Sequence, residues 1–322
     1  MDTRTLRHTD LTVSRVCFGT MTFGGQTDEA GASAMVATCL EHGVNFFDTA
    51  NTYQAGQSET ILGRILKGRR DRVVLASKCA ARMGPGADEV GLSRAAILRA
   101  AEDSLRRLQT DRLDLYYLHW PDYAVPLEES LGAMDELVRS GKVRYVAASN
   151  FAAWQMCWMH WLAETKGLPR VSVTQPMYNL IARGLEQEYL PMCQHLRVST
   201  VVYNPLAGGL LTGKQKFEAP LAGTRFDQNQ MYLDRYWHEA NFAALTELNA
   251  LAAAANRSLV SVALNWILHH TPVDSIILGA SKLSHLQENL RTLGDGALPP
   301  ETVTGLDRVW ARLRGPSPKY NR

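Results

Sequence analysis

Short apolar runs alternate regularly with helical stretches along this chain, and this order restricts the folds open to it. Eight runs rich in β-branched and aromatic residues are typical of buried strands: residues 16–20, 44–47, 73–77, 113–118, 143–148, 171–174, 199–202 and 275–278. Helical patterns separate them. After Ser93, a residue type that caps helices, apolar residues at Ile97, Ala101, Leu105 and Leu108 fall on one helical face. Such alternation predicts an α/β fold in which parallel strands close into a (β/α)8 TIM barrel.

The competing architecture is an open, doubly wound sheet of the Rossmann type. Its dinucleotide fingerprint, Gly-x-Gly-x-x-Gly, does not follow the first expected strand. No linker divides the chain, so we expect residues 1–322 to form a single barrel domain. An N-terminal β-hairpin is expected around residues 4–13, and long loops are expected over the C-terminal face. The longest, residues 204–235, is expected to be irregular, and loops of that length usually carry function.

Charge and cysteine content restrict the classes of partner. The formal net charge of +2 is too small to favour nucleic acid or an anionic membrane. No run approaches the ~18 apolar residues of a membrane helix, and residues 1–10 lack the apolar core of a secretory signal. The 5 cysteines show no metal-ligand spacing, which fits free thiols in a reducing compartment. We therefore expect a cytoplasmic protein without a metal site. Cys79 is expected to be a packing residue. A homodimer is one option for the oligomeric state.

Polar residues stand where three consecutive strands end. Asp48, Lys78 and His119 follow the second, third and fourth strands, and Tyr53 lies on the loop after Asp48. Because the carboxyl ends of parallel strands meet at one end of a barrel, we expect these side chains to converge. A phenol, with an ordinary pKa of ~10, becomes a usable acid when a neighbouring ammonium lowers that pKa. A carboxylate can hold the lysine, and an imidazole can orient a carbonyl or relay a proton.

Taken singly, each of these residues has an ordinary structural interpretation: a turn aspartate, a solvated lysine or a packed histidine. Together they indicate a proton donor for carbonyl reduction. The motifs around them resemble those of the aldo-keto reductase family over nearly the whole chain, at residues 43–50, 56–59, 114–119, 141–144 and 148–150. The resemblance implies that Asp48, Tyr53, Lys78 and His119 are the catalytic tetrad, with Tyr53 as the acid. It also implies a small-molecule aldehyde or ketone as substrate and hydride transfer from NADPH, which becomes NADP+.

The same resemblance assigns cofactor contacts to the ends of later strands. It implies that Ser149, Asn150 and Gln175 hold the nicotinamide carboxamide, which needs paired donors and acceptors, and that Tyr203 stacks on the ring. The glycine-rich segment that follows resembles the family's loop over the cofactor pyrophosphate. The contacts implied there are Asn204, Leu206, Gly208, Leu210 and Lys214.

A second anion site is implied after the last strand. Gly279, Ser281 and Lys282 resemble the family's site for the adenosine 2′-phosphate, beside a helix N-terminus. Glu288 and Asn289 match the adenine contacts. At the remaining cofactor position His285 stands where the family more often has Gln or Arg.

Within the family, the chain resembles the branch of the aflatoxin-aldehyde and succinic semialdehyde reductases at residues 119–122, 149–154, 177–179 and 204–214. That branch commonly has Met after the catalytic histidine, where this chain has Trp120, a candidate substrate contact. Arg225 in the long loop and the terminal Arg322 are candidate partners of a substrate carboxylate, because a guanidinium fork matches that group. The alternative for both arginines is simple solvation.

We therefore expect a preference for aldehydes that carry a carboxylate or a second carbonyl. Two other functions stay open. One is a reductase of sugars or aromatic aldehydes. The other is a cofactor-binding regulatory subunit on the same scaffold, like the channel-associated relatives of the family, since barrels host many chemistries.

Overall fold

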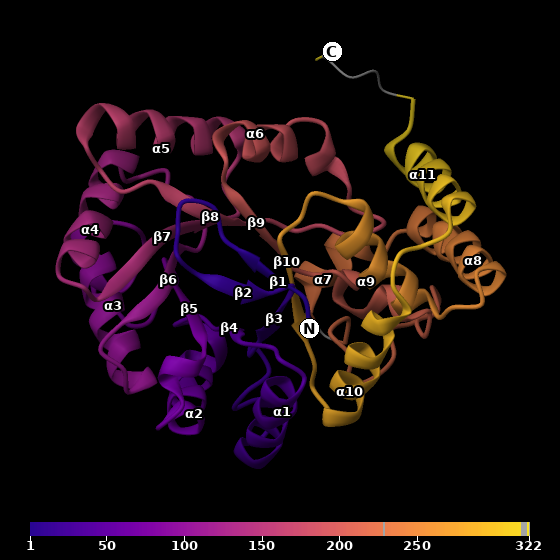
Figure 1. The fold of residues 1–322 in the computed structure, drawn as a ribbon, viewed down its shortest axis with the longest axis horizontal. Coiled ribbons are helices and arrows are strands. Elements are labelled where there is room, and N and C mark those ends of the chain that lie inside the picture. The colour runs from indigo at the N-terminus through magenta and orange to yellow at the C-terminus, as the bar shows by residue number, and fades with distance from the viewer. Residues whose placement is uncertain (228, 317–320, 322) are drawn as a thin grey trace. The chain divides into compact units, whose positions relative to one another are not determined.

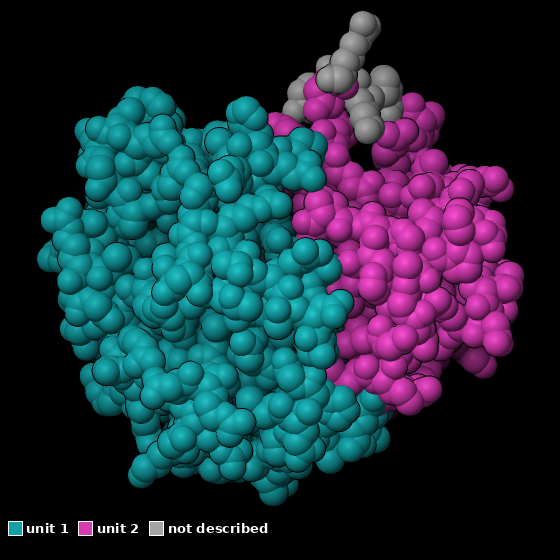
Figure 2. Space-filling model, in the orientation of Figure 1, with its two compact units in different colours: residues 1–176, 191–201, 274–287 teal, residues 177–190, 202–273, 288–322 magenta. Residues whose placement is uncertain are grey.

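The computed structural model describes residues 1–227, 229–316 and 321, which belong to two compact units. Unit 1 contains residues 1–176, 191–201 and 274–287, and unit 2 contains residues 177–190, 202–273 and 288–322 (Figure 2). That residues 1–322 fold as a single domain stays a prediction.

The strands of unit 1 close into a barrel of eight parallel strands, which confirms the predicted fold (Figure 1). The order around the barrel is β10, β3, β4, β5, β6, β7, β8 and β9. Their bounds are β3 Val16–Gly19, β4 Phe46–Asp48, β5 Val74–Cys79, β6 Leu113–Leu118, β7 Val143–Ser149, β8 Val171–Gln175, β9 Ser199–Val202 and β10 Ser275–Gly279. A closed barrel has no free sheet edge, so each strand finds hydrogen-bonding partners on both sides.

Helices connect successive strands and lie outside the barrel (Figure 1). They are α1 Glu29–Glu41, α2 Gln57–Leu66, α3 Arg94–Leu108, α4 Leu127–Arg139 and α5 Ala153–Lys166, with α6 Tyr189–Leu196 and α10 Leu283–Thr292 at the unit boundaries. The predicted cap and apolar face of α3 are present: the Ser93 hydroxyl accepts from the Ala96 N–H, and Ile97, Ala101 and Leu105 are buried. Short 3₁₀ turns are η1 Tyr53–Gly56, η2 Arg70–Arg72 and η3 Ala87–Glu89.

The predicted N-terminal hairpin is present and contributes to the barrel core. Its antiparallel strands are β1 Thr3–Thr5 and β2 Thr12–Ser14. Leu6, Leu11 and Val13 join a buried cluster that fills the barrel. The barrel members of that cluster include Cys17, Phe46, Val74, Ala76, Leu115, Tyr117, Ala147, Val173 and Val201.

The alternation of strand side chains places the polar residues directly after this core. Side chains two positions apart face the same side of a strand. Among the residues two positions beyond the barrel members of the core are Asp48, Lys78, His119, Ser149 and Gln175. All five therefore face the interior, at the carboxyl end of the strands. These strands extend one or two residues further than expected, so that they include Asp48, Lys78, Ser149 and Gln175.

Unit 2 contains the helices α7 Gln230–Tyr236, α8 Glu239–Ala254, α9 Leu259–His270 and α11 Pro300–Arg314, with 3₁₀ turns η4 Gly184–Glu186, η5 Ala207–Thr212 and η6 Leu293–Asp295. Trp266 packs against the Tyr178 ring, with centroids 5.3 Å apart. The expectation that residues 204–235 are irregular throughout was wrong, because η5 lies within them and α7 begins at Gln230. Tyr232 and Tyr236, four residues apart in α7, are both buried, and this spacing stabilises the helix.

No single helix in the described part of the chain is both long and apolar enough to cross a membrane; α8 and α9 pass that test only jointly, and they meet at an 84° bend.

Candidate active site

The Lys78 ammonium is the centre of a buried polar cluster in unit 1. Its side chain is fully buried in β5. Nζ donates to Asp48 Oδ1, to the Thr49 carbonyl oxygen at 2.7 Å and to Tyr53 Oη at 3.2 Å. An ammonium has three hydrogens. These three acceptors therefore satisfy Lys78 completely and fix its direction.

The charge of Lys78 is maintained against burial. Burial alone lowers the pKa of the ammonium, but its interactions with Asp48 and Tyr53 outweigh that effect and raise the pKa of Lys78. Lys78 is therefore a cation throughout the neutral range, directly beside a phenol.

Asp48 is held on both carboxylate oxygens. Oδ1 accepts from Lys78, and Oδ2 accepts from Gln175 Nε2 at 2.8 Å. The carbonyl of Asp48 accepts from the Thr20 N–H at 2.9 Å. Two contacts were not apparent in the sequence: the bond from Gln175 in β8 to Asp48 in β4, and the bond from Lys78 to the Thr49 carbonyl. No local motif reports hydrogen bonds between residues of separate strands.

Tyr53 lies at the start of an unusual turn. Gln54, Ala55 and Gly56 have φ angles of 50°, 52° and 89°, so three consecutive residues adopt the left-handed conformation. This region is costly for residues other than glycine and is occupied where surrounding structure enforces it. The turn places the Tyr53 ring 4.8 Å from Lys78 Nζ and edge-on to the His119 ring, with centroids 6.1 Å apart.

His119 is a neutral imidazole at the same site. Its side chain is buried, and its Nδ1 has no hydrogen-bond partner among the described residues. Burial, and then the charge of Lys78, hold the pKa of His119 well below its usual range. A neutral imidazole can donate one hydrogen bond and accept another without carrying charge. Trp120, 38% exposed, packs beside it with ring centroids 4.5 Å apart.

The three residues expected to hold a carboxamide also lie together. Ser149 Oγ donates to the Gln175 carbonyl at 2.8 Å, and Asn150 Nδ2 donates to Ser149 Oγ at 3.0 Å and to the His119 carbonyl at 2.9 Å. Two primary amides and a hydroxyl on adjacent strand ends supply the donors and acceptors that a nicotinamide carboxamide requires. The side chains present therefore fit this part of a nicotinamide cofactor.

Of the expected 2′-phosphate residues in unit 1, Gly279 ends β10, and Ser281 and Lys282 follow it. The carbonyl of Ala280 accepts from Thr22 Oγ1 at 2.9 Å, and that of Ser281 accepts from Thr27 Oγ1 at 3.2 Å. These bonds fix the backbone immediately before Lys282 and the N-terminus of α10, while His285 lies in the first turn of the helix. A cation at a helix N-terminus fits a phosphate group.

The other predicted site residues belong to unit 2: Tyr203, Asn204, Leu206, Gly208, Leu210, Lys214, Arg225, Glu288 and Asn289. Gly208 has a φ of 69°, and a Cβ there would lie 2.7 Å from the Tyr232 ring, so this turn requires glycine. Arg225 Nη1 donates to Tyr232 Oη at 3.0 Å. Arg322 lies outside the described residues.

Cys79 behaves as a packing residue, as expected. It is buried in β5, and burial raises the pKa of its thiol to about 12, so it is not a reactive thiolate at neutral pH. Among the described residues, no group of three or more His, Cys, Asp or Glu side chains is arranged to hold a metal ion.

Comparison with known proteins agrees with this geometry. The model of the "Aldo/keto reductase family" matches residues 15–311. The chain is 37% identical to human "Aldo-keto reductase family 7 member A3", over 94% of this chain and 96% of that protein. It is also 37% identical to human "Aflatoxin B1 aldehyde reductase member 2", over 94% and 88%. A "Probable voltage-gated potassium channel subunit beta" of Arabidopsis thaliana is 33% identical, over 96% and 95%. This chain therefore belongs to the aldo/keto reductase family, whose members are oxidoreductases that generally use NAD(P)H.

Proposed function

We propose that this protein reduces aldehydes to alcohols with NADPH and that Tyr53 supplies the proton. One observation carries the proposal: a fully buried ammonium, Lys78, bonds at once to Asp48, to the Thr49 carbonyl and to the Tyr53 phenol. Such an arrangement stabilises the phenolate that remains after proton donation. The similarity to a protein named for the reduction of an aldehyde supports the substrate class.

Each residue of the cluster has a distinct role in this proposal. The Tyr53 hydroxyl gives its proton to the carbonyl oxygen of the substrate. Neutral His119 donates a hydrogen bond that orients the same oxygen, and its low pKa keeps it from competing as a general acid. Lys78 stabilises the developing phenolate, while Asp48 holds the ammonium in place.

NADPH, when bound, supplies the hydride. Ser149, Asn150 and Gln175 would bind its carboxamide, Tyr203 would stack on its ring, and the loop of residues 204–214 would cover its pyrophosphate. Lys282, with Ser281, would contact the 2′-phosphate, which NADH lacks; the charge of Lys282 at the start of α10 supports NADPH as the preferred cofactor. Gly279, His285, Glu288 and Asn289 would complete the adenosine contacts.

We further propose that the substrate carries a carboxylate or a second carbonyl near the reacting aldehyde. Arg225 supports this choice because its guanidinium is a donor fork suited to a carboxylate. Trp120 is exposed beside His119, where it can cover an apolar part of the substrate.

A panel of carbonyl substrates, each assayed with NADPH and NADH, tests the proposal. It contains succinic semialdehyde, butanal, methylglyoxal, 4-nitrobenzaldehyde and an aldose. We expect the highest kcat/KM for succinic semialdehyde or methylglyoxal with NADPH. A profile led by the aldose or by 4-nitrobenzaldehyde would contradict the substrate class. NADPH binding without turnover of any carbonyl would contradict the catalytic role and favour a regulatory subunit.

A further inference from the structure

A buried carboxylate outside the tetrad joins the two segments that carry Tyr53 and Lys78. Glu59, in the first turn of α2, is fully buried. Its Oε1 accepts from Ser77 Oγ at 2.5 Å, and its Oε2 accepts from Arg107 Nε at 2.7 Å. Ser77 directly precedes Lys78 in β5. Neighbouring strand residues face opposite sides. Glu59 therefore binds the outward-facing side of β5 through Ser77, while Lys78 lies on the inward-facing side.

Arg107 joins this carboxylate to the turn that carries Tyr53. Gly56 ends that turn, and a Cβ at Gly56 would lie 2.8 Å from Arg107 Cδ and 3.1 Å from Arg107 Nε. The arginine side chain therefore rests directly on the backbone three residues after Tyr53. A side chain from α3 thus touches the Tyr53 turn while it holds Glu59, which in turn holds β5.

The approach of α3 is itself fixed by a glycine. A Cβ at Gly63 of α2 would lie 2.6 Å from the Leu108 carbonyl oxygen and 2.7 Å from that of Arg107. Only glycine allows the end of α3 to lie this close to α2. The position of Arg107 against Gly56 is therefore set by backbone packing and not by the flexible side chain alone.

The Tyr53 turn needs such external support. Gln54 and Ala55 occupy left-handed conformations that L-residues disfavour. A turn that carries this cost relaxes when its contacts are removed. Its relaxation would change the 3.2 Å contact between Tyr53 Oη and Lys78 Nζ.

We propose that Glu59 and Arg107 are positioning residues for proton donation: together they hold the Tyr53 turn and β5 in the register that brings the phenol against the Lys78 ammonium. This inference rests on the proposed role of Tyr53 as the acid. Neither residue contacts the reacting atoms, so both act through Tyr53 and Lys78.

The charged and titratable groups near both centres define what a pH profile reports. Lys78 and His119 face the Tyr53 phenol, and Asp48 binds Lys78. Arg107 binds Glu59, Tyr116 lies near Glu59, and Cys79 lies near Tyr116. Burial, with Cys79 and Glu59, raises the pKa of Tyr116 well above its usual range, and burial raises that of Cys79, so both stay neutral near pH 7. A change in the alkaline limb of kcat after substitution of Arg107 therefore reports on Tyr53 and Lys78.

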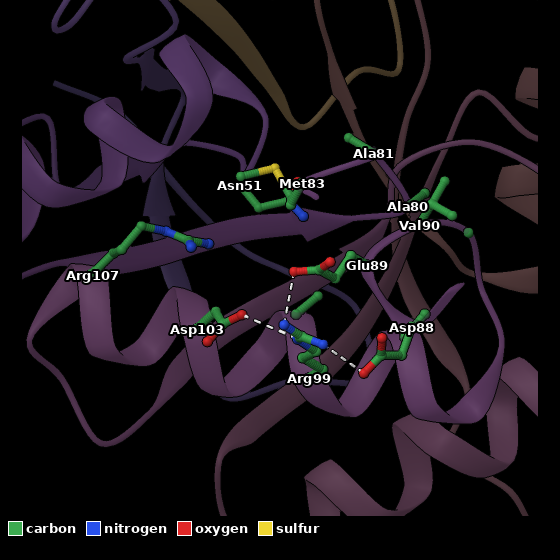
Figure 3. A pocket seen from close by; sticks show the side chains of 13 residues that line it. Asn51, Ala80, Ala81, Met83, Asp88, Glu89, Val90, Arg99, Asp103 and Arg107 are labelled. Atoms are coloured by element: carbon green, nitrogen blue, oxygen red, sulfur yellow. Dashed lines mark hydrogen bonds and ion pairs between the residues drawn. The ribbon is translucent and has the colours of Figure 1, made fainter. Parts of the chain in front are cut away.

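A pocket beside Arg107 permits a direct experiment. Arg107, Asn51, Met83, Ala80 and Arg99 are among the residues that line this pocket (Figure 3). Arg99 is held there by Asp88 and Glu89, each at 2.7 Å, while Arg107 reaches the same space from the far end of α3. Guanidinium ion can therefore enter and replace the missing group in an Arg107→Ala variant.

The experiment measures kcat, the KM for NADPH, the pH profile and the unfolding temperature of Arg107→Ala, with and without ~20 mM guanidinium chloride, well below molar denaturing concentrations. We expect kcat to fall about tenfold, since small displacements of catalytic groups cost 10- to 100-fold. The KM for NADPH should change less than about twofold, and the alkaline limb should move to higher pH because the phenol has lost contact with the cation. Guanidinium should restore kcat at least about threefold.

Arg70→Ala is the matched control. Arg70 also pairs with a buried carboxylate, Asp114, at 2.8 Å, and its side chain is 15% exposed against 23% for Arg107. Asp114 lies at the amino end of β6, whereas His119 follows the carboxyl end. Arg70→Ala should lower the unfolding temperature by a similar amount and leave kcat and its pH profile unchanged.

Arg107→Lys keeps the positive charge but lacks the planar guanidinium. It is the variant to measure if Arg107→Ala does not fold. We expect it to retain an intermediate kcat and an intermediate alkaline limb. The inference is overturned if either Arg107 variant matches Arg70→Ala in kcat and pH profile. It is also overturned if guanidinium restores the unfolding temperature of Arg107→Ala but not its kcat. Failure of the proposed function looks different: Tyr53→Phe would then retain turnover, whatever Arg107 does.

Discussion

Lys78 Nζ and Tyr53 Oη lie 3.2 Å apart, and the ammonium has no freedom to leave. Its two other hydrogens are committed to Asp48 and to the Thr49 carbonyl, and its side chain is completely buried. A cation fixed in this way beside a phenol stabilises the phenolate, and the cation does not have to move during the reaction.

Lys78→Met should impair both chemistry and stability. Loss of the cation leaves a weak phenolic acid, so kcat should fall by roughly 10²-fold or more and the alkaline limb of its pH profile should move upward. Asp48 would then be a buried charge without its main partner, which costs about 3–5 kcal/mol. Urea unfolding and pH–rate profiles measure both effects. Lys142→Met, which removes an exposed pair with Glu102, is the control; equal effects in the two variants would refute the special role of Lys78.

Stability should decline in mild acid because of two buried histidines. Burial, and then a neighbouring cation, lower the pKa of both His119 and His160. In the unfolded chain a histidine binds a proton near pH 6.5. The unfolded state therefore binds more protons below that pH, so this stability is present in full above ~6.5 and is lost as the pH falls. The unfolding free energy should drop between pH 7 and 5, and less steeply in a His119→Gln/His160→Gln variant. An unchanged slope in that variant would exclude these histidines as the cause.

Lys282→Ala should discriminate between the two nicotinamide cofactors. Only NADPH carries the 2′-phosphate, and a hydrogen bond to a charged group contributes about 1.5–3 kcal/mol. Fluorescence titration should show that the binding free energy of NADPH is weakened by about this amount. The binding free energy of NADH should change little. Lys67→Ala, at the exposed end of α2, should affect neither cofactor. A loss of equal size for NADPH and NADH would show that Lys282 does not contact the 2′-phosphate.

Arg225→Ala should alter substrate choice. Arg225 and Arg235 both lie over the Tyr232 ring, with guanidinium carbons 5.7 Å and 5.9 Å from its centroid, so Arg235→Ala controls for loss of that packing. If Arg225 binds the carboxylate, its removal should raise the KM for succinic semialdehyde about tenfold or more, as for loss of a charged hydrogen bond, with little change for butanal. The ratio of the KM for succinic semialdehyde to the KM for butanal should therefore differ between Arg225→Ala and Arg235→Ala. An equal ratio in the two variants would count against a carboxylate contact.

The barrel and the convergence of polar groups were predictable because both follow from local patterns. Apolar runs define the strands, and the two-residue alternation that buries Ala76 also turns Lys78 inward. The same rule applies to Phe46 with Asp48. A sequence therefore reveals which side chains face the barrel interior.

The contacts that fix these groups were not predictable from local patterns. Gln175 reaches Asp48 across 127 positions, and Arg107 reaches Glu59 across 48. Hydrogen bonds of this kind depend on how distant elements pack, and no periodicity reports them. The helix α7 was missed for a related reason: burial of Tyr232 and Tyr236 stabilises it, and burial is set by tertiary structure.

Whether Tyr53 donates the proton can be measured with a single substitution. Tyr53→Phe removes one oxygen and keeps the ring, and Tyr145→Phe is its control because that hydroxyl bonds to Asp10 in the N-terminal hairpin loop. The measurement is kcat for reduction of succinic semialdehyde with NADPH, together with NADPH affinity by fluorescence. We expect unchanged affinity, a loss of kcat of roughly 10²–10⁴-fold in Tyr53→Phe and near-normal kcat in Tyr145→Phe. Near-normal turnover by Tyr53→Phe would show that Tyr53 is not the proton donor.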